Sequence, residues 1–231
     1  MKFAAIVVAA GRGVRFGRQK QLVEVAGRPL VAWSFATFAT LHELVELVIA
    51  TEEEHLATMA DLAARFAPAL RATVVRGGAT RQESVRNALA AVSADADAAF
   101  VHDGARPLVR ADDIRAGMAA VDRGVGALIA APVIDTIKVV APGGIVARTL
   151  DRAELWAAQT PQFGTLADLR AAHDAAARDG IVATDDAMLL ERAGHRVVVI
   201  PASAENFKVT MPGDRDLAEA ILRERSAEAR A

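Results

Sequence analysis

The chain of 231 residues contains no cysteine and no tyrosine, and only 4% of its residues are aromatic. The absence of cysteine excludes a disulfide framework, cysteine-ligated zinc, iron–sulfur clusters and a thiol nucleophile. The scarcity of aromatic side chains argues against a base-stacking platform for nucleic acid. A formal net charge of −2 provides no overall basic field, so any anion site has to be built locally.

Long apolar runs are missing as well, since no stretch reaches the roughly 20 apolar residues that a membrane-spanning helix needs. The apolar run 3–10 is short and leads directly into a glycine- and arginine-rich loop, which favours a strand over a signal peptide. We therefore expect a cytoplasmic protein without a membrane or nucleic-acid partner. With 53% hydrophobic residues the chain can fill one core, and we expect a single domain over 1–231.

Short apolar runs alternate with longer helical patterns. The runs 3–8, 45–50, 72–75, 98–101 and 127–130 lack the alternation of a half-exposed strand and are typical of strands buried on both faces. Thr51 and Thr80 are each followed three residues later by a glutamate, which predicts a capping box at two helix starts. The series predicts an α/β fold with a mostly parallel sheet, helices on both faces, and a ligand site at the carboxyl ends of the strands.

The pattern changes between residues 132 and 155. Strand-like runs 133–140 and 145–150 flank the turn sequence Ala141-Pro142-Gly143-Gly144, which predicts a β-hairpin. A two-stranded arm is marginal on its own in water, so we expect this projecting arm to pack on the same arm of a second subunit and form a homodimer. Beyond it we expect helices over 166–178 and 185–192, strands near 196–200 and 206–209, and a C-terminal helix that begins at Pro212.

The strongest functional signal is the glycine-rich loop that directly follows the first strand. Gly11 and Gly13 allow backbone N–H groups to approach an anion closely. The loop contributes four basic side chains before the first acidic residue, Glu24, namely Arg12, Arg15, Arg18 and Lys20. This combination predicts a polyphosphate site. A solvated basic turn is the plain alternative, and a dinucleotide site fits poorly because the third glycine comes one residue late and no acidic residue follows at the expected distance.

A second motif, His102-Asp103-Gly104-Ala105-Arg106-Pro107, follows the run 98–101. A carboxylate at the end of a strand faces the ligand crevice, so Asp103 is predicted to hold Mg²⁺. The alternative is that Asp103 pairs with Arg106 and locks the loop. His102 is expected to pack in the core, because no second ligand lies at a suitable spacing, and the other four histidines are expected at the surface.

The segment 76–84 follows the third run and opens a helix. Its backbone donors and the Ser84 hydroxyl can read a nucleobase or a ribose edge, but a simple turn with a capping box explains the pattern equally well. Toward the C-terminus, Arg152 and Lys208 lie beside hydroxyl or amide residues at strand and helix edges. A solvated surface explains each of these segments when it is taken alone.

Together the segments resemble the 2-C-methyl-D-erythritol 4-phosphate cytidylyltransferase family of the non-mevalonate isoprenoid pathway over nearly the whole chain. The motifs are Ala9-Ala10-Gly11, the segment 102–107, Asp135-Thr136-Ile137-Lys138, Asp151-Arg152, Leu155-Trp156, Thr160-Pro161-Gln162, Thr184-Asp185 and Lys208-Val209-Thr210. The resemblance implies a Rossmann-like nucleotidyltransferase that transfers CMP from CTP with Mg²⁺ or another divalent cation, releases pyrophosphate, and is a homodimer with interlocking arms. Gln19 replaces the usual proline before the loop lysine, and Gly104 replaces the common alanine after the aspartate.

The resemblance also implies roles by position. Arg15 and Lys20 would contact the CTP phosphates and the transition state, Arg152 and Lys208 would be further catalytic cations, and Asp103 would hold the metal. The nucleotide site would comprise Ala9, Ala10, Gly11, Gly13, Gly77, Ser84 and Asp103. The sugar-phosphate site would comprise Thr136, Arg152, Thr160, Thr184 and Lys208.

The residues agree with such a reaction, since a phosphate is already a nucleophile and cations alone can align two anions. Three alternatives remain at this point. One is a cytidylyltransferase for another polyol phosphate such as ribitol 5-phosphate, and the second is a guanylyl- or uridylyltransferase. The third is a nucleotide-binding regulator that has no turnover.

Overall fold

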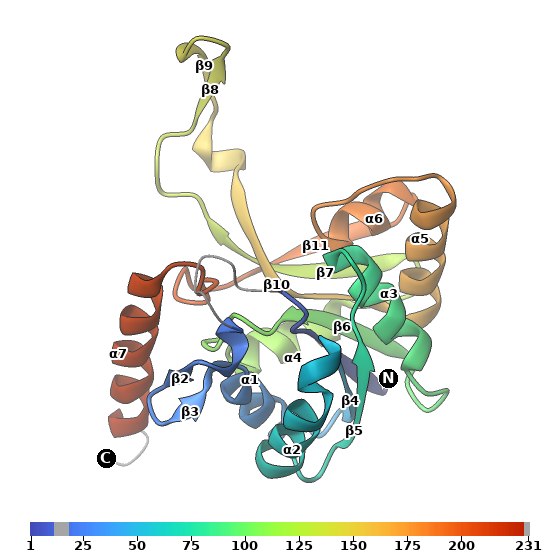
Figure 1. The fold of residues 1–231 in the computed structure, drawn as a ribbon. Coiled ribbons are helices and arrows are strands. Elements are labelled where there is room, and N and C mark those ends of the chain that lie inside the picture. Colours follow the sequence, from blue (N-terminus) through green and yellow to red (C-terminus); the bar gives the residue numbers. More distant parts are fainter. Residues whose placement is uncertain (12–18, 229–231) are drawn as a thin grey trace.

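The computed structural model describes residues 1–11 and 19–228, which fold around a seven-stranded sheet with the strand order β11-β7-β10-β6-β1-β4-β5 (Figure 1). The strands are β1 (Phe3–Val8), β4 (Leu44–Thr51), β5 (Arg71–Arg76), β6 (Ala98–Asp103), β7 (Val125–Pro132), β10 (Trp156–Thr165) and β11 (Arg196–Pro201). Neighbouring strands pair in parallel except at β10, which runs antiparallel to both β6 and β7. The expected mostly parallel sheet is confirmed.

Helices cover both faces of this sheet. The helices α1 (Leu30–Phe38), α2 (Leu56–Phe66) and α4 (Ala111–Ala120) pack on one face, and α3 (Arg81–Ala91), α5 (Leu166–Arg178) and α6 (Asp186–Arg192) pack on the other. Successive residues of β1 alternate between the two cores, with Phe3, Ala5 and Val7 in the first and Ala4 and Ile6 in the second. Burial on both faces explains why the strand sequences are continuously apolar.

Two smaller units complete the fold. The C-terminal helix α7 (Pro212–Glu228) packs through Ala218 and Leu222 against Val25 and Leu30, close to the short strands β2 (Glu24–Val25) and β3 (Arg28–Pro29).

No helix within the described parts of the chain combines the length and apolar content required to span a bilayer.

The hairpin expected near residue 140 consists of β8 (Lys138–Ala141) and β9 (Ile145–Thr149). Gly143 and Gly144 form its turn with φ of 86° and 79°, a region that favours glycine. Figure 1 shows the hairpin projecting from the body of the molecule beyond the ends of β7 and β10. Its first strand begins at Lys138 and not at residue 133 as expected, and residues 133–137 adopt no regular structure.

Several local expectations are wrong. The segment 206–209 forms no strand, and the sheet instead takes up β10, which the sequence analysis missed. Thr51 ends β4 and caps no helix, because the short 3₁₀ helix η3 (Glu53–His55) lies between β4 and α2. His173 is buried in α5 rather than at the surface. The helix start at Thr80 is confirmed, since its hydroxyl accepts a hydrogen bond from the Glu83 N–H at 3.1 Å, but Glu83 Oε2 accepts in return from the Ala79 N–H at 2.7 Å rather than from that of Thr80.

Candidate active site

A cavity of about 1080 Å³ lies at the carboxyl ends of four neighbouring strands. Val8 of β1, Thr51 of β4, Arg76 of β5 and Asp103 of β6 all line it. From β1 the chain crosses to β4 on one side, and β6 lies on the other side, which creates a crevice of the kind that holds ligands in α/β proteins. The cavity therefore lies where the βαβ pattern predicts a ligand site.

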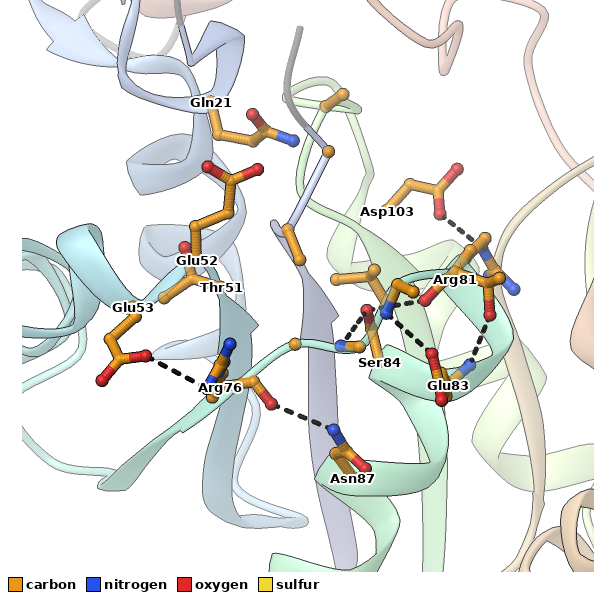
Figure 2. A pocket seen from close by; sticks show the side chains of 18 of the residues that line it. Gln21, Thr51, Glu52, Glu53, Arg76, Arg81, Glu83, Ser84, Asn87 and Asp103 are labelled. Carbon is orange, nitrogen blue, oxygen red and sulfur yellow. Dashed lines mark hydrogen bonds and ion pairs between the residues drawn. The ribbon is translucent and has the colours of Figure 1, made fainter.

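The loop 76–80 forms one wall of the cavity, and its close packing depends on Gly77. A Cβ at Gly77 would lie 2.4 Å from Ala10 Cβ and 3.0 Å from Ser84 Oγ, so only glycine fits without a shift of the backbone. The Ser84 hydroxyl donates to Thr80 O at 2.8 Å and accepts from the Gly78 N–H at 3.0 Å (Figure 2). Because its proton is committed, Ser84 can only accept a hydrogen bond from a ligand.

Most of the predicted nucleotide residues that the structure describes come together here. Ala10, Gly11, Gly77, Ser84 and Asp103 line the cavity, whereas Ala9 is buried beneath it. Of the loop residues predicted to contact phosphate, Gly13, Arg15 and the further cations Arg12 and Arg18 lie outside the described residues.

Lys20 is at the start of the 3₁₀ helix η2 (Lys20–Leu22) and lines the cavity. The preceding Gln19 donates through Nε2 to Ala9 O at 2.7 Å, which ties this segment to the end of β1. The residue that departs from the family's usual proline therefore has a structural role of its own.

Asp103 is the carboxylate at the centre of the site, and two cations bind it. Arg81 Nε lies 3.0 Å from Oδ1, and Lys208 Nζ lies 2.7 Å from Oδ2. Burial alone would raise the pKa of Asp103, but the charges of Arg81 and Lys208 hold that pKa well below its usual range. The carboxylate is thus ionised at any working pH. The alternative pairing is wrong, since Arg106 donates to Asn206 O at 2.7 Å instead.

Arg81 was missed in the sequence analysis, although it belongs to the segment 76–84. Its Nη2 lies 2.8 Å from Oδ2 of Asp186, a side chain with 1% exposure whose Oδ1 lies 3.0 Å from His173 Nε2. Burial opposes the charge on Arg81, but the two carboxylates raise the pKa of the guanidinium above its usual value. Arg81 therefore bridges the cavity wall to the first turn of α6.

His102 lies in the core beneath Asp103, as expected. Its Nε2 is 3.2 Å from Ser34 Oγ, and its Nδ1 is 3.2 Å from Thr160 Oγ1. Burial lowers the pKa of His102 to about 4, so the ring is neutral near pH 7. The Thr160 hydroxyl accepts from the Asp103 N–H at 3.0 Å, which places this predicted sugar-phosphate ligand in a buried cluster that supports Asp103.

The other predicted sugar-phosphate residues are spread over three parts of the molecule. Thr136 and Arg152 belong to the arm, where Arg152 Nη1 donates to Ile134 O at 2.8 Å. Thr184 is exposed in the loop before α6. Of the five residues predicted for this substrate, Lys208 alone lines the cavity in the described chain. The structure therefore does not bring the arm residues to the chain's own cavity.

The carboxylate of Asp103 is a suitable ligand for Mg²⁺ in this cavity. Mg²⁺ usually binds one or two carboxylates and completes its shell with waters and substrate phosphates. Each oxygen of Asp103 is bonded to a cation but keeps a further lone pair. The donor set present is thus suited to a hard cation that phosphates share.

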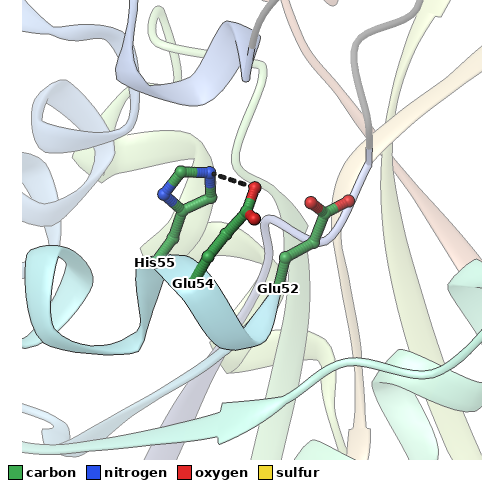
Figure 3. Close-up of side chains that lie close together, drawn as sticks. All are labelled: Glu52, Glu54 and His55. Carbon is green, nitrogen blue, oxygen red and sulfur yellow. Dashed lines mark ion pairs between the residues drawn. The ribbon is translucent and has the colours of Figure 1, made fainter.

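A second cluster of possible ligands lies at the rim (Figure 3). One ligand atom each of Glu52, Glu54 and His55 lies within 4.8 Å of the others, and His55 Nε2 is 3.3 Å from Glu54 Oε1. Exposed acidic groups of this kind are common without a metal, so we assign no ion to them.

Comparison with known proteins shows which family the chain matches. A family model for 2-C-methyl-D-erythritol 4-phosphate cytidylyltransferase matches residues 3–224. The curated enzyme of that name from Halalkalibacterium halodurans is 40% identical over 227 residues, which is 97% of this chain and 99% of the relative. The one from Synechococcus sp. strain CC9902 is 42% identical and covers 96% of this chain and 98% of its own.

Solved structures show the same fold. The crystal structure of 2-C-methyl-D-erythritol 4-phosphate cytidylyltransferase from Thermus thermophilus superposes with a TM-score of 0.77 at 34% identity, and covers 96% of this chain and 100% of that one. A synthase structure from Anaerococcus prevotii superposes with a TM-score of 0.85 at 24% identity over 96% of both chains.

Proposed function

Because the chain belongs to the 2-C-methyl-D-erythritol 4-phosphate cytidylyltransferase family, we propose that its cavity is where CMP is transferred from CTP to 2-C-methyl-D-erythritol 4-phosphate. The products are 4-diphosphocytidyl-2-C-methyl-D-erythritol and pyrophosphate, in the non-mevalonate route to isoprenoids. The observation that carries the proposal is the position of the Asp103–Lys208 pair beside the close-packed loop at Gly77 and Ser84. A cytoplasmic location stays a prediction.

In this reaction an oxygen of the acceptor phosphate attacks the α-phosphorus of CTP, and the bond from that phosphorus to the pyrophosphate oxygen breaks. No side chain has to remove a proton, because the attacking phosphate is already ionised. Asp103 is unsuited to such a role in any case, since its pKa lies well below its usual range. The protein's contribution is to align two anions and to stabilise charge at the α-phosphate.

The cations divide this work according to position. Lys20 follows Gln19, which is bonded to the end of β1, and Lys208 is bonded to Asp103; both side chains line the cavity. We assign Lys20, with Arg15, to the CTP phosphates and Lys208 to the acceptor phosphate. Asp103 would hold Mg²⁺ or another divalent cation, which supplies positive charge to the phosphate oxygens when it is bound.

We assign Thr136 and Arg152 to the cavity of the partner subunit in a homodimer. The described lining of the cavity includes no residue of the arm, and Figure 1 shows the arm leading away from the body. The arm also exposes apolar side chains, including Ile134 at 77% and Ile145 at 69%. A second arm would cover these side chains and bring Arg152 to a site that lacks it.

A substrate panel tests the reaction. Each of the four nucleoside triphosphates is combined with methylerythritol, ribitol or glycerol phosphate, and pyrophosphate release is measured. Release should require CTP together with methylerythritol phosphate. Release with ribitol phosphate instead would support the other polyol phosphate, and the absence of turnover with every pair would favour the regulator.

Mixing two variants that each bind the sugar phosphate weakly tests the shared site, with activity measured well below saturation by methylerythritol phosphate. In a heterodimer of Lys208→Ala and Arg152→Ala chains, one site carries both changes and the other carries neither. Random exchange of subunits should therefore restore about a quarter of the wild-type sites. If activity does not return although subunits exchange, Arg152 acts within its own chain or outside the site.

A further inference from the structure

One side chain, Gln82, makes two hydrogen bonds to the backbone of the loop between α5 and α6. Gln82 Nε2 donates to Ile181 O at 3.0 Å, and Gln82 Oε1 accepts from the Ala183 N–H at 3.0 Å. A carboxamide that satisfies a carbonyl and an N–H at once fixes the backbone between them, much as a neighbouring strand does. Thr184 is the next residue, so its position is set from α3.

Ile181 and Ala183 also pack against the core, but the residues around them are open to solvent. Val182, between the two bonded residues, is 83% exposed, and Thr184 is exposed as well. On the far side of Thr184, the Asp185 side chain caps α6 and accepts from Gln162 Nε2 at 3.0 Å. The backbone just before Thr184 is therefore held by the two bonds from Gln82 together with the packing of Ile181 and Ala183.

Gln82 lies in the first turn of α3, and neighbouring residues of this turn contact the wall of the cavity assigned to the nucleotide. The hydroxyl of Ser84 packs against the cavity loop, and Arg81 joins Asp103 to Asp186 at the start of α6. This first turn thus contacts the nucleotide wall on one side and the segment around Thr184 on the other. Of these contacts, those of Gln82 are confined to the second side.

We propose that Gln82 is a positioning residue for the sugar phosphate and orders the segment that carries Thr184 before this substrate binds. The proposal rests on the proposed function, in which Thr184 contacts the acceptor. Without Gln82 the acceptor has to order the loop itself, which weakens its binding in the ground state and the transition state equally. The nucleotide wall keeps its own bonds and is unaffected.

The variant Gln82→Met tests the proposal, because methionine has a similar length and helix propensity but makes neither bond. The KM for methylerythritol phosphate should rise about tenfold, whereas the KM for CTP and kcat at saturation should change by less than about twofold. Gln82→Glu, which loses the donor to Ile181 O, should raise the same KM.

The matched control is Arg86→Ala on the same helix. Arg86 joins α3 to Asp174 of α5 at 3.2 Å, away from the loop, so its loss should leave both KM values unchanged. Hydrogen exchange provides a readout that does not depend on turnover. The Ala183 amide should exchange faster in Gln82→Met than in Arg86→Ala, while the Ile181 amide, bonded to Ala176 O at 2.9 Å, serves as the reference.

Two results would overturn the proposal. One is an unchanged KM for the acceptor in both Gln82 variants, although the Ala183 amide exchanges hydrogen faster than in the wild type. The other is an equal rise in both KM values, which indicates general loosening of the site. A wild-type protein that forms no pyrophosphate from CTP and methylerythritol phosphate would instead refute the proposed function itself.

Discussion

Replacing Lys208 by alanine should weaken the binding of the sugar phosphate far more than the binding of CTP. Lys208 Nζ lies 2.7 Å from Asp103, with a side chain that is 37% exposed and can turn toward a bound phosphate. A hydrogen bond to a charged group contributes about 1.5–3 kcal/mol, or about ten- to one-hundred-fold in affinity. Because the ammonium is partly solvated, we expect the lower end, a roughly tenfold rise in the KM for methylerythritol phosphate.

The assay is pyrophosphate release with each substrate varied at saturation of the other. Asp103 keeps Arg81 as a partner at 3.0 Å, so the variant should fold and retain its CTP site. Lys2→Ala is the matched control, since Lys2 is exposed and precedes β1 at the amino end of the strand, whereas the carboxyl end lines the cavity. The reasoning fails if the KM for CTP rises as much as that for the sugar phosphate, or if it rises alone.

Three further predictions concern other parts of the molecule. Lys20→Ala should lower kcat by a factor on the order of 10² to 10³, as the loss of one preorganised charge typically does. Lys20→Arg should also have a low kcat. A wild-type kcat of Lys20→Ala at saturating CTP would show that Lys20 does not contact the transition state. Deleting the arm over 138–149 should abolish both dimerisation and activity, as measured by sedimentation and pyrophosphate release; a fully active wild-type monomer at micromolar concentration would contradict the shared site. Because the folded pKa of His102 is about 4 against an ordinary 6.5, the unfolded chain binds more protons between these pH values and stability falls as pH drops through them. From pH 7 to 4.5 the loss should be about 2 kcal/mol greater in the wild type than in His102→Gln, measured by urea denaturation, and equal losses would exclude His102 as the cause.

The sequence predicted those parts of the fold that depend on local patterns. The observed β1 and α5 match the expected ranges 3–8 and 166–178, because continuous apolar runs and helical periodicity are properties of short segments. The strand β10 was missed since its sequence, WAAQTPQFGT, contains a proline and polar residues that usually interrupt strands. A register shift between Ala158 and Gln162 accommodates them, and only the neighbouring strands decide it.

The predicted site shows the same division. Gly77 was placed at the nucleotide site by the family resemblance alone, and its close packing against Ala10 depends on how β1 and the loop 76–80 meet in the fold. The partners of Asp103 could not be read from the sequence either, because Lys208 is 105 residues distant and any of the 27 basic residues could supply the charge. Arg106, the nearest candidate in the sequence, proved to bond a backbone carbonyl. The family resemblance placed Thr160 among the sugar-phosphate ligands, but the sequence could not show that its hydroxyl is buried and bonded to the Asp103 N–H.

The charges around Asp103 indicate which groups attract the substrates. Arg81 and Lys208 balance the carboxylates of Asp103 and Asp186, so this cluster has no net charge to offer a triphosphate. Its value is directional: Arg81 is fixed between two carboxylates, and Asp103 holds Lys208 at the cavity before any phosphate arrives. Attraction of CTP would therefore come from cations outside the cluster, of which Lys20 and Arg76 line the cavity. Such a neutral, ordered cluster can distinguish two anionic substrates, because cations outside it would attract the more highly charged one while Lys208 remains aligned for the other.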